Sequence, residues 1–585
     1  MDVLVNAVGM DRNPHIYIEP QTNMLPIMSQ RMQGQPMIVL GDDADRLKNE
    51  DAQSHNISAA RAVAESVRST LGPKGMDKML VSSIGDVTVT NDGVTILEEM
   101  DIENPTAKMI VEVAQTQEDE AGDGTTTAVS LAGELLKNAE ELLEQDIHPT
   151  SIIRGYDMAA KQAREEIDDI AVPVDPSDEE ILKSVAATSM TGKGAELNLD
   201  LLSDLVVETA QAVSVDAEDG STVVDLEYVD IMAEPGRPVD DSKLINGGTI
   251  DTDPDHEDMP TEVEDADILL LDAPFTVNEM ENDAQLSVDD PDQLQEFIEQ
   301  EEQALREKVQ GVVDAGVDVV LSKKSIDEMA QHLLAREGIL SISQIKRSDL
   351  EFLTEVLGTQ LHSDLDFESI TDSDLGTGDI SRDPEDGWYV VESDGNHGVT
   401  LVVRGSTEHV SDELERGITD ALDVVAATIT DGRVLAGGGA TEIELAGRLR
   451  EYADGVSGRE QLAVEAFADA FDLVPRVLAE NAGLDSIDTL VELRAAHEAG
   501  DGHAGLDVYD GEVVDTYEAG VVEPAHAKSQ AVSSAVEAAN LVLKIDDIIS
   551  ATALGEDYED EDQGQGGMGG GMGGMGGMGG MGGMM

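Results

Sequence analysis

The sequence contains no cysteine among its 585 residues. This absence excludes disulfides, thiolate catalysis and cysteine-based zinc sites. The eleven histidines do not occur at metal-ligand spacings such as His-Glu-x-x-His, so we expect no dedicated transition-metal site. No apolar run approaches the roughly 20 residues that a membrane span needs. The chain opens with Met-Asp-Val-Leu-Val, which has an acid where an export signal has Lys or Arg, so we expect no such signal.

Basic residues are scarce. Only 35 Lys and Arg stand against 124 Asp and Glu, which gives a formal net charge of −89. A nucleic-acid duplex or an anionic membrane would be repelled, so we exclude both as partners. The acidic residues are spread along the whole chain rather than confined to a tail. Because molar salt screens such repulsion within about 3 Å, we expect the cytoplasm of a halophilic organism.

The most informative stretch is residues 122–127, Gly-Asp-Gly-Thr-Thr-Thr. The glycines allow a tight turn and a close approach of backbone N–H groups to a ligand, and Asp123 is a hard oxygen ligand suited to Mg²⁺. The threonines open an amphipathic helix over 125–143, whose N-terminus favours anions. This pattern predicts a phosphate site with a divalent cation. The alternative is a helix cap chosen for its turn. The Walker pattern is absent, since no Gly-Lys-Ser/Thr follows.

The remaining patterns predict a nested chain. Apolar periodicity predicts helices over 58–71, 107–120, 151–170, 411–430, 440–452, 459–481 and 525–549, with two more inside 177–212. Between about 236 and 392, strands at 243–251, 266–271, 317–321 and 338–342 alternate with helices after Asp290-Pro291 and over 325–336. An α/β unit is therefore expected inside a mainly helical protein.

The two ends differ from the rest. Residues 1–27 show no structural pattern, and Met28 and Met32 are alternative start residues. The last twenty residues contain only Gly and Met, a composition that cannot form a core and predicts a flexible tail. We interpret its methionines as soft apolar contacts rather than metal ligands.

Five segments together resemble the group II chaperonins, the thermosome and CCT-like ATP-driven folding machines. They are Arg-Ser-Thr-Leu-Gly-Pro-Lys-Gly-Met-Asp-Lys-Met at 68–79, Thr-Asn-Asp-Gly-Val-Thr-Ile-Leu at 90–97, Gln-Glu-Asp-Glu-Ala-Gly-Asp-Gly-Thr-Thr-Thr at 117–127, Asp-Gly-Arg-Val-Leu-Ala-Gly-Gly-Gly-Ala at 431–440 and Gly-Val-Val-Glu-Pro at 520–524. Each is weak alone. Their order, their spacing and the Gly/Met tail make the resemblance specific over about residues 35–549.

The resemblance implies a multidomain α+β subunit. Its mainly helical equatorial domain would comprise 28–172 and 426–554, and its small intermediate domain 173–243 and 392–425. An α/β apical domain would cover 244–391, with a lid protrusion at about 274–300 that contains Phe275, Val277 and Met280. Residues 1–27 would be an extension and 555–585 an acidic, then Gly/Met-rich, flexible tail. Like or paralogous subunits would form a double ring, sixteen in all, which encloses non-native polypeptides.

The resemblance also implies site residues and the ligands ATP and Mg²⁺, with K⁺ as a further candidate ion. Asp123 resembles the Mg²⁺ ligand, and Asp92 and Asp420 the pair that orients the attacking water. Asp420 would arrive from another domain, which would couple hydrolysis to closure. The residues that would bind the nucleotide are Thr70, Leu71, Gly72, Pro73, Gly93, Gly124, Thr125, Thr126, Thr127, Lys193, Gly437, Gly438, Asp507 and Glu523.

Simpler interpretations stay open for single residues. Asp92-Gly93 is typical of a type I′ hairpin turn. Asp420 follows Arg416 by four residues and would suit an exposed helix ion pair. Lys193 alone is an ordinary loop lysine, and residues 437–439 alone are a glycine linker. At the level of the protein, the alternatives to an ATP-driven chaperonin are a stand-alone metabolic ATPase or kinase and a passive holding assembly, which would not need Asp420.

Overall fold

We describe a computed structural model of the chain, covering residues 46–48, 50–82, 85, 87–193, 198–217, 222–276, 291–363, 370–371, 374–393 and 398–549. Residues 47–548 form one compact unit. The predictions for 1–27, for the tail at 555–585 and for most of the lid fall outside these residues. Among the helices of the described part, none is long and apolar enough to cross a membrane.

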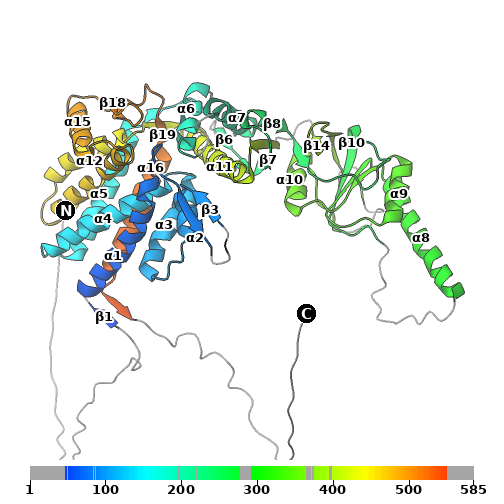
Figure 1. Ribbon diagram of the computed structural model, residues 1–585, viewed down its shortest axis with the longest axis horizontal. Coiled ribbons are helices and arrows are strands. Elements are labelled where there is room, and N and C mark those ends of the chain that lie inside the picture. Colours follow the sequence, from blue (N-terminus) through cyan, green and yellow to red (C-terminus); the bar gives the residue numbers. More distant parts are fainter. Residues whose placement is uncertain are drawn as a thin grey trace, which may run out of the picture. The chain divides into compact units, whose positions relative to one another are not determined.

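The first of three apolar cores, here the helical core, combines segments from both ends of the chain (Figure 1). Its main helices are α1 (Glu50–Val67), α3 (Pro105–Ala121), α4 (Thr125–Glu144), α5 (Pro149–Ile170), α12 (Ala440–Asp454), α13 (Glu460–Ala470) and α16 (Ala525–Lys544). Around them lie η1 (Arg68–Thr70), α2 (Gly93–Glu99), α14 (Leu473–Asn481), α15 (Ser486–Glu498) and the strands β1 (Arg46–Lys48), β2 (Lys78–Val81), β3 (Val87–Thr90), β4 (Val172–Pro173), β16 (Arg433–Ala436), β17 (Ala504–Asp507), β18 (Glu512–Asp515), β19 (Val522–Pro524) and β20 (Asp547–Ile549).

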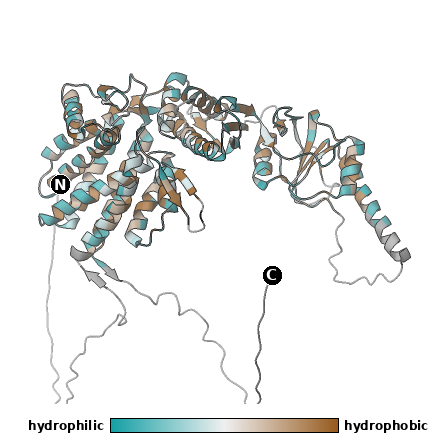
Figure 2. Cartoon of the chain, viewed as in Figure 1, coloured by the Kyte–Doolittle hydropathy of each residue, from teal (hydrophilic) through white to brown (hydrophobic). Residues whose placement is uncertain are grey.

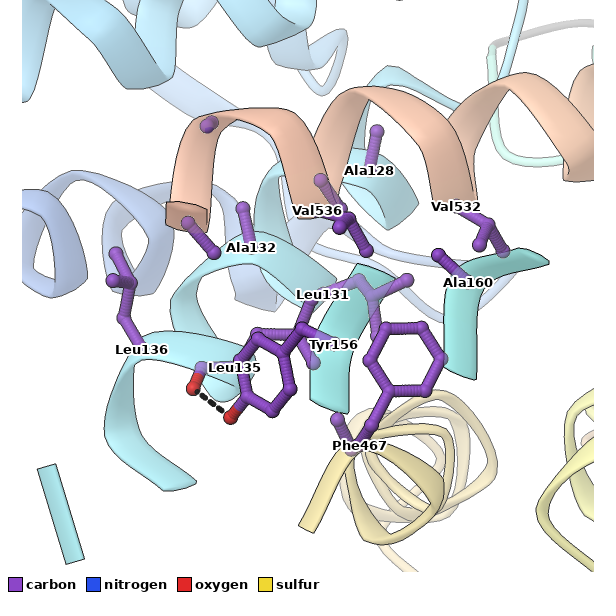
Figure 3. Close-up of a cluster of buried hydrophobic side chains, with 14 of the residues drawn as sticks. Ala128, Leu131, Ala132, Leu135, Leu136, Tyr156, Ala160, Phe467, Val532 and Val536 are labelled. Carbon is purple, nitrogen blue, oxygen red and sulfur yellow. Dashed lines mark hydrogen bonds between the residues drawn. The ribbon is translucent and has the colours of Figure 1, made fainter. Parts of the chain in front are cut away.

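Tyr156 packs within the helical core (Figure 3). Its fully buried ring meets the ring of Phe467 edge to face at 5.7 Å, and its hydroxyl donates to the carbonyl of Leu135 at 2.8 Å. A buried Tyr needs such an acceptor. In Figure 2, hydrophobic and hydrophilic residues alternate along the helices of this core, as expected where each helix buries one face.

The second core, the sheet core, surrounds a six-stranded sheet in the order β12-β11-β10-β13-β14-β9. The strands are β9 (Gly248–Ile250), β10 (Glu262–Leu271), β11 (Val319–Ser322), β12 (Leu340–Ile342), β13 (Gly376–Arg382) and β14 (Tyr389–Glu392), and the helices α8 (Pro291–Asp314), α9 (Glu328–Glu337) and α10 (Arg347–Leu357). Strands β10, β11 and β12 are parallel, with α8 and α9 as the crossovers. The predicted α/β unit is therefore present. Phe275, expected in the lid protrusion, is instead fully buried in this core.

The third core, the connecting core, contains α6 (Glu179–Met190), α7 (Leu199–Ala212), α11 (Glu408–Asp431) and the sheet β7-β15-β8. These strands are β7 (Val229–Pro235), β8 (Lys243–Asn246) and β15 (Val399–Gly405), with the hairpin β5 (Ser214–Asp216) and β6 (Thr222–Val224) and the short helices η2 (Leu226–Tyr228) and η3 (Val239–Asp241) beside them. Mixed helix and sheet in three cores confirms the predicted α+β class.

Two predicted helices have the wrong bounds, and the type I′ turn considered for Asp92-Gly93 is absent. The helix expected over 459–481 is two helices, because the ring of Pro475 prevents the helix from continuing across Phe471 and Asp472. The helix expected to reach 549 ends at Lys544 and is followed by β20; acids at positions 546 and 547 oppose the helix dipole there. Gly93 is the first residue of helix α2, so Asp92-Gly93 does not form the centre of a hairpin turn.

Candidate functional site

The loop between α3 and α4 is shaped by two left-handed glycines. Gly122 ends α3 with φ +66°, and Gly124 begins α4 with φ +83° and no side-chain cap. The buried amide of Gln117 donates to the carbonyl of Asp123 at 2.7 Å and fixes the loop from behind. The first N–H groups of α4 therefore have no side-chain acceptor from a capping residue, which leaves them available to an anion.

This loop faces a cavity of about 540 Å³. Fifteen of the predicted site residues line it: Thr70, Leu71, Gly72, Pro73, Asp92, Gly93, Asp123, Gly124, Thr125, Thr126, Thr127, Lys193, Gly438, Asp507 and Glu523. A size of 300–1,000 Å³ is typical of small-molecule sites. One side of the cavity is apolar, because Val474, Leu478, Leu506 and Val508 form a small cluster against which Leu71 packs. One cavity thus combines a loop suited to bind phosphate with an apolar surface.

Gly438 lines the cavity and Gly437 lies directly beside it, so neither belongs to a linker. Gly437 donates its N–H to the carbonyl of Val521 at 2.8 Å, and a Cβ on it would lie 3.2 Å from Oε1 of Glu523. Gly438 has φ +64° and lies beside Leu506, so a side chain would be strained there. Gly437 itself is not among the lining residues.

Asp420 lies outside the cavity lining but is tied to it by Lys193. The ammonium of Lys193 is 2.5 Å from Oδ2 of Asp420 and 3.5 Å from Oδ1 of Asp123. Asp420 is only 9% exposed, and Arg416 pairs with Glu413 instead, at 3.4 Å. The exposed ion pair with Arg416 is therefore wrong for Asp420. One lysine connects a carboxylate of α11, in the connecting core, to the loop before α4.

Burial dominates the electrostatics of this group. It raises the pKa of Asp420 to about 6, although the Lys193 ammonium opposes the change. Burial alone would lower the pKa of Lys193, but Asp123 and Asp420 raise it, so this lysine stays charged. Burial, followed by the charges of Asp420 and Asp92, also raises the pKa of Glu118 on α3 to about 8. A carboxyl with a raised pKa, one cation and three further carboxyls thus lie close together beside the cavity.

Asp92 begins helix α2. Its Oδ2 accepts from the N–H of Thr95 at 2.7 Å, and its own N–H donates to the hydroxyl of Thr90. Its backbone is extended, with φ −65°, so the type I′ turn is wrong. This helix cap fixes the carboxylate at the cavity wall while one oxygen, Oδ1, has no role in the cap.

Three further lining residues escaped the sequence analysis. Asn91 donates its side-chain amide to the carbonyl of Gly192, Thr516 donates to the carbonyl of Gly437 at 3.0 Å, and Lys528 is buried between Glu442 and Glu523. Lys528 carried a usable signal, because it is a single lysine on the apolar stripe of a predicted helix, a position where a charge needs partners.

The donors fit a magnesium nucleotide better than a metal held by protein alone. Among the described residues, no group of three or more His, Cys, Asp or Glu could hold a metal ion. Mg²⁺ usually takes one or two carboxylates and completes its shell with phosphate and water oxygens. Asp123, next to the threonine hydroxyls and the start of α4, offers that arrangement.

Comparisons with known proteins agree over nearly the whole length. The model of the TCP-1/cpn60 chaperonin family matches residues 63–553. The chain is 65% identical over 540 residues to thermosome subunit 2 of Haloferax volcanii, covering 92% of this chain and 97% of the relative. It is 64% identical over 534 residues to thermosome subunit beta of Halobacterium salinarum, covering 91% and 96%. A solved open-state monomer of a group II chaperonin from Methanococcoides burtonii is 41% identical with a TM-score of 0.58, covering 72% of this chain and all of that one.

Proposed function

The chain belongs to the TCP-1/cpn60 chaperonin family and is a group II chaperonin, and on that premise we propose that it hydrolyses Mg-ATP in the 540 Å³ cavity. The observation that carries the proposal is Lys193, which lies between Asp123 of the α3–α4 loop and Asp420 of α11. This contact supports a site completed by two cores rather than a pocket within one.

Each proposed role follows from the chemistry of phosphoryl transfer, which needs positioning and charge neutralisation more than covalent steps. Asp123 would hold Mg²⁺, which neutralises phosphate charge when bound. Gly124 and the threonines 125–127 would bind the phosphates at the start of α4. Lys193 would add a positive charge beside them. The carboxyl groups of Asp92 and Asp420 would orient the attacking water.

The nucleoside would occupy the other side of the cavity. The apolar cluster around Leu478, together with Leu71 and Pro73, suits the face of a base. Glu523 and Asp507 offer carboxylates for hydroxyl and amino groups. Gly438 allows the backbone to approach the ligand closely, and Gly437 would assist from beside the wall. Thr70, Gly72 and Gly93 complete the wall. K⁺ is a further candidate ion in the halophilic cytoplasm that the acidic composition suggests; relatives from Haloferax and Halobacterium agree with such an origin.

We assign the helical core to an equatorial domain, the connecting core to an intermediate domain and the sheet core to an apical domain. The boundaries are close to those expected from the sequence, moved so that β8 and α11 each belong whole to the intermediate domain. Like or paralogous subunits would form a double ring of sixteen that encloses non-native polypeptides. Because Asp420 belongs to α11, turnover would depend on how closely α11 approaches the α3–α4 loop, and this would couple hydrolysis to closure of the ring.

The test is Asp420→Ala in the full assembly in molar KCl. We expect phosphate release to fall at least about a hundredfold, since loss of a water-orienting group typically costs 10²–10⁴ in rate, while a fluorescent ATP analogue still binds. Asp412→Ala on the same helix is the matched control and should retain activity. Normal turnover by the Asp420→Ala assembly would refute the mechanism.

A further inference from the structure

A second buried lysine lines the same cavity as Lys193. Lys528, in the first turn of α16, is 8% exposed. Its Nζ is 2.5 Å from Oε1 of Glu442 and 2.6 Å from Oε2 of Glu523. Glu442 on α12 is 1% exposed, whereas about one-third of the Glu523 side chain is exposed, through the cavity that it lines. One cation therefore joins a fully enclosed carboxylate to a carboxylate that a ligand can reach.

The two carboxylate oxygens of Glu523 have different surroundings. Lys528 holds Oε2, while Oε1 lies next to Gly437, 3.2 Å from where a Cβ on that glycine would be. No hydrogen bond to Oε1 occurs within the described part of the chain. Gly437 is itself fixed, since its N–H donates to Val521 and its carbonyl accepts from Thr516. A side chain with one oxygen anchored and the other beside rigid backbone has a defined direction in the cavity.

The two carboxylates keep the Lys528 ammonium charged. Burial would lower the pKa of Lys528, but Glu442 and Glu523 raise it, so the ammonium persists. Burial raises the pKa of Glu523, Lys528 opposes this, and Glu442 and Asp123 act in the same direction as burial. Without Lys528, two carboxylates would face each other in a nearly dry site, and an isolated buried charge is unfavourable.

We propose that Lys528 is a positioning residue that directs Oε1 of Glu523 to accept a hydrogen bond from a ribose hydroxyl, and so makes the cavity selective for ribonucleotides over deoxyribonucleotides. This inference rests on the proposed function, because it takes the nucleoside to lie beside Glu523. A site built to accept from a hydroxyl rejects a ligand that lacks it, since the polar group is then left without its partner. The alternative is a purely structural lysine that only neutralises the buried Glu442.

The test measures kcat and KM of the full assembly in molar KCl with ATP, 2′-deoxy-ATP and 3′-deoxy-ATP. For the natural chain we expect a preference in kcat/KM of about 10- to 100-fold for ATP over at least one deoxy analogue, the range of a charge-assisted hydrogen bond. Lys528→Met should reduce the preference to below about threefold through KM, with kcat within about threefold. Glu442→Gln alone keeps the Lys528–Glu523 pair and should keep the preference.

The double variant Lys528→Met/Glu442→Gln separates positioning from structure, and it remains informative if Lys528→Met alone fails to fold. It has no unpaired buried carboxylate at position 442, so a purely structural lysine predicts recovery of both thermal stability and the preference for ATP. Positioning predicts that stability recovers and the preference stays lost. Recovery of the preference, or a natural chain that does not distinguish the three nucleotides, would overturn the inference while leaving ATP hydrolysis intact. An assembly without ATP turnover would overturn the proposed function and this inference together.

Discussion

Gly122→Ala tests how α11 is held against the α3–α4 loop. Gly122 has φ +66°, and a Cβ built on it would lie 2.2 Å from Cβ and 3.1 Å from Cγ of Asp423. Asp423 is three residues after Asp420 on α11, so the methyl group would push this part of the helix away from the loop. The left-handed conformation costs Ala about 1–2 kcal/mol, and overpacking costs a further 1–3 kcal/mol or so. We expect the free energy of unfolding to fall by about 2–5 kcal/mol.

Gly432→Ala is the matched control. Gly432 ends α11 with φ +68°, and the nearest atom to an added Cβ is the carbonyl oxygen of Val174 at 3.6 Å, an ordinary contact. This variant should lose only the conformational part, about 1–2 kcal/mol. The difference between the two variants measures the contact of α11 with the loop. Thermal unfolding in molar KCl gives the stabilities, and phosphate release with binding of a fluorescent ATP analogue gives the function.

Displacement of α11 also predicts a specific kinetic defect. Gly122→Ala should bind nucleotide at Thr125 and its neighbours but hydrolyse it slowly, because Asp420 moves with α11. Equal destabilisation by the Gly122 and Gly432 variants, together with normal hydrolysis in both, would refute the reasoning, since the added methyl group would then have been accommodated without moving the helix.

Two further predictions concern the half-buried Glu118 and the fully buried Tyr156. The pKa of Glu118 is raised from 4.5 to about 8 in the folded chain. Between these pH values the folded chain binds a proton at Glu118 that the unfolded chain has lost. The free energy of unfolding therefore falls as pH rises through this window. Glu118→Gln should therefore be more stable than the natural chain by on the order of 1 kcal/mol at pH 8, after solvent screening, and equally stable near pH 4.5. Thermal unfolding without Mg²⁺ or nucleotide measures this difference. An equal gain at both pH values would contradict the raised pKa. Tyr156→Phe removes the hydrogen bond to the carbonyl of Leu135 and should lower the free energy of unfolding by about 0.5–1.5 kcal/mol, and an unchanged melting temperature would show that this bond contributes nothing.

The fold could be predicted where an element has its own apolar stripe. Helix α4 was expected over 125–143 and runs from Thr125 to Glu144, and α5 was expected over 151–170 and runs from Pro149 to Ile170. Helix α15 was missed because only Leu493 is buried along its length, so no periodicity marks it. Helix α10 carries a stripe of Leu350, Leu353, Val356 and Leu357 and could have been found.

The site could be predicted only in part, for a physical reason. A phosphate loop such as 122–127 consists of consecutive residues, so its turn, its metal ligand and the start of its helix can be predicted from the local sequence. The partners of Lys193 and Lys528 lie on other elements, and Asp420 is 227 positions from Lys193. Burial decides whether such a lysine is an ordinary loop residue or part of a site, and no local pattern reports it.

Because basic residues are scarce in this chain, the few that are buried between carboxylates are informative. In a chain of net charge −89 at molar salt, exposed ion pairs contribute little, because screening acts over about 3 Å and side-chain entropy opposes them. The pair Lys161–Glu165 is of this kind, with both side chains more than half exposed. Lys193 and Lys528 are each enclosed between two carboxylates beside the cavity, where salt cannot replace them. At high salt, exposed lysines and the two enclosed lysines should therefore differ. Substitution of an enclosed lysine should affect nucleotide binding or turnover at salt concentrations where loss of an exposed lysine has no effect.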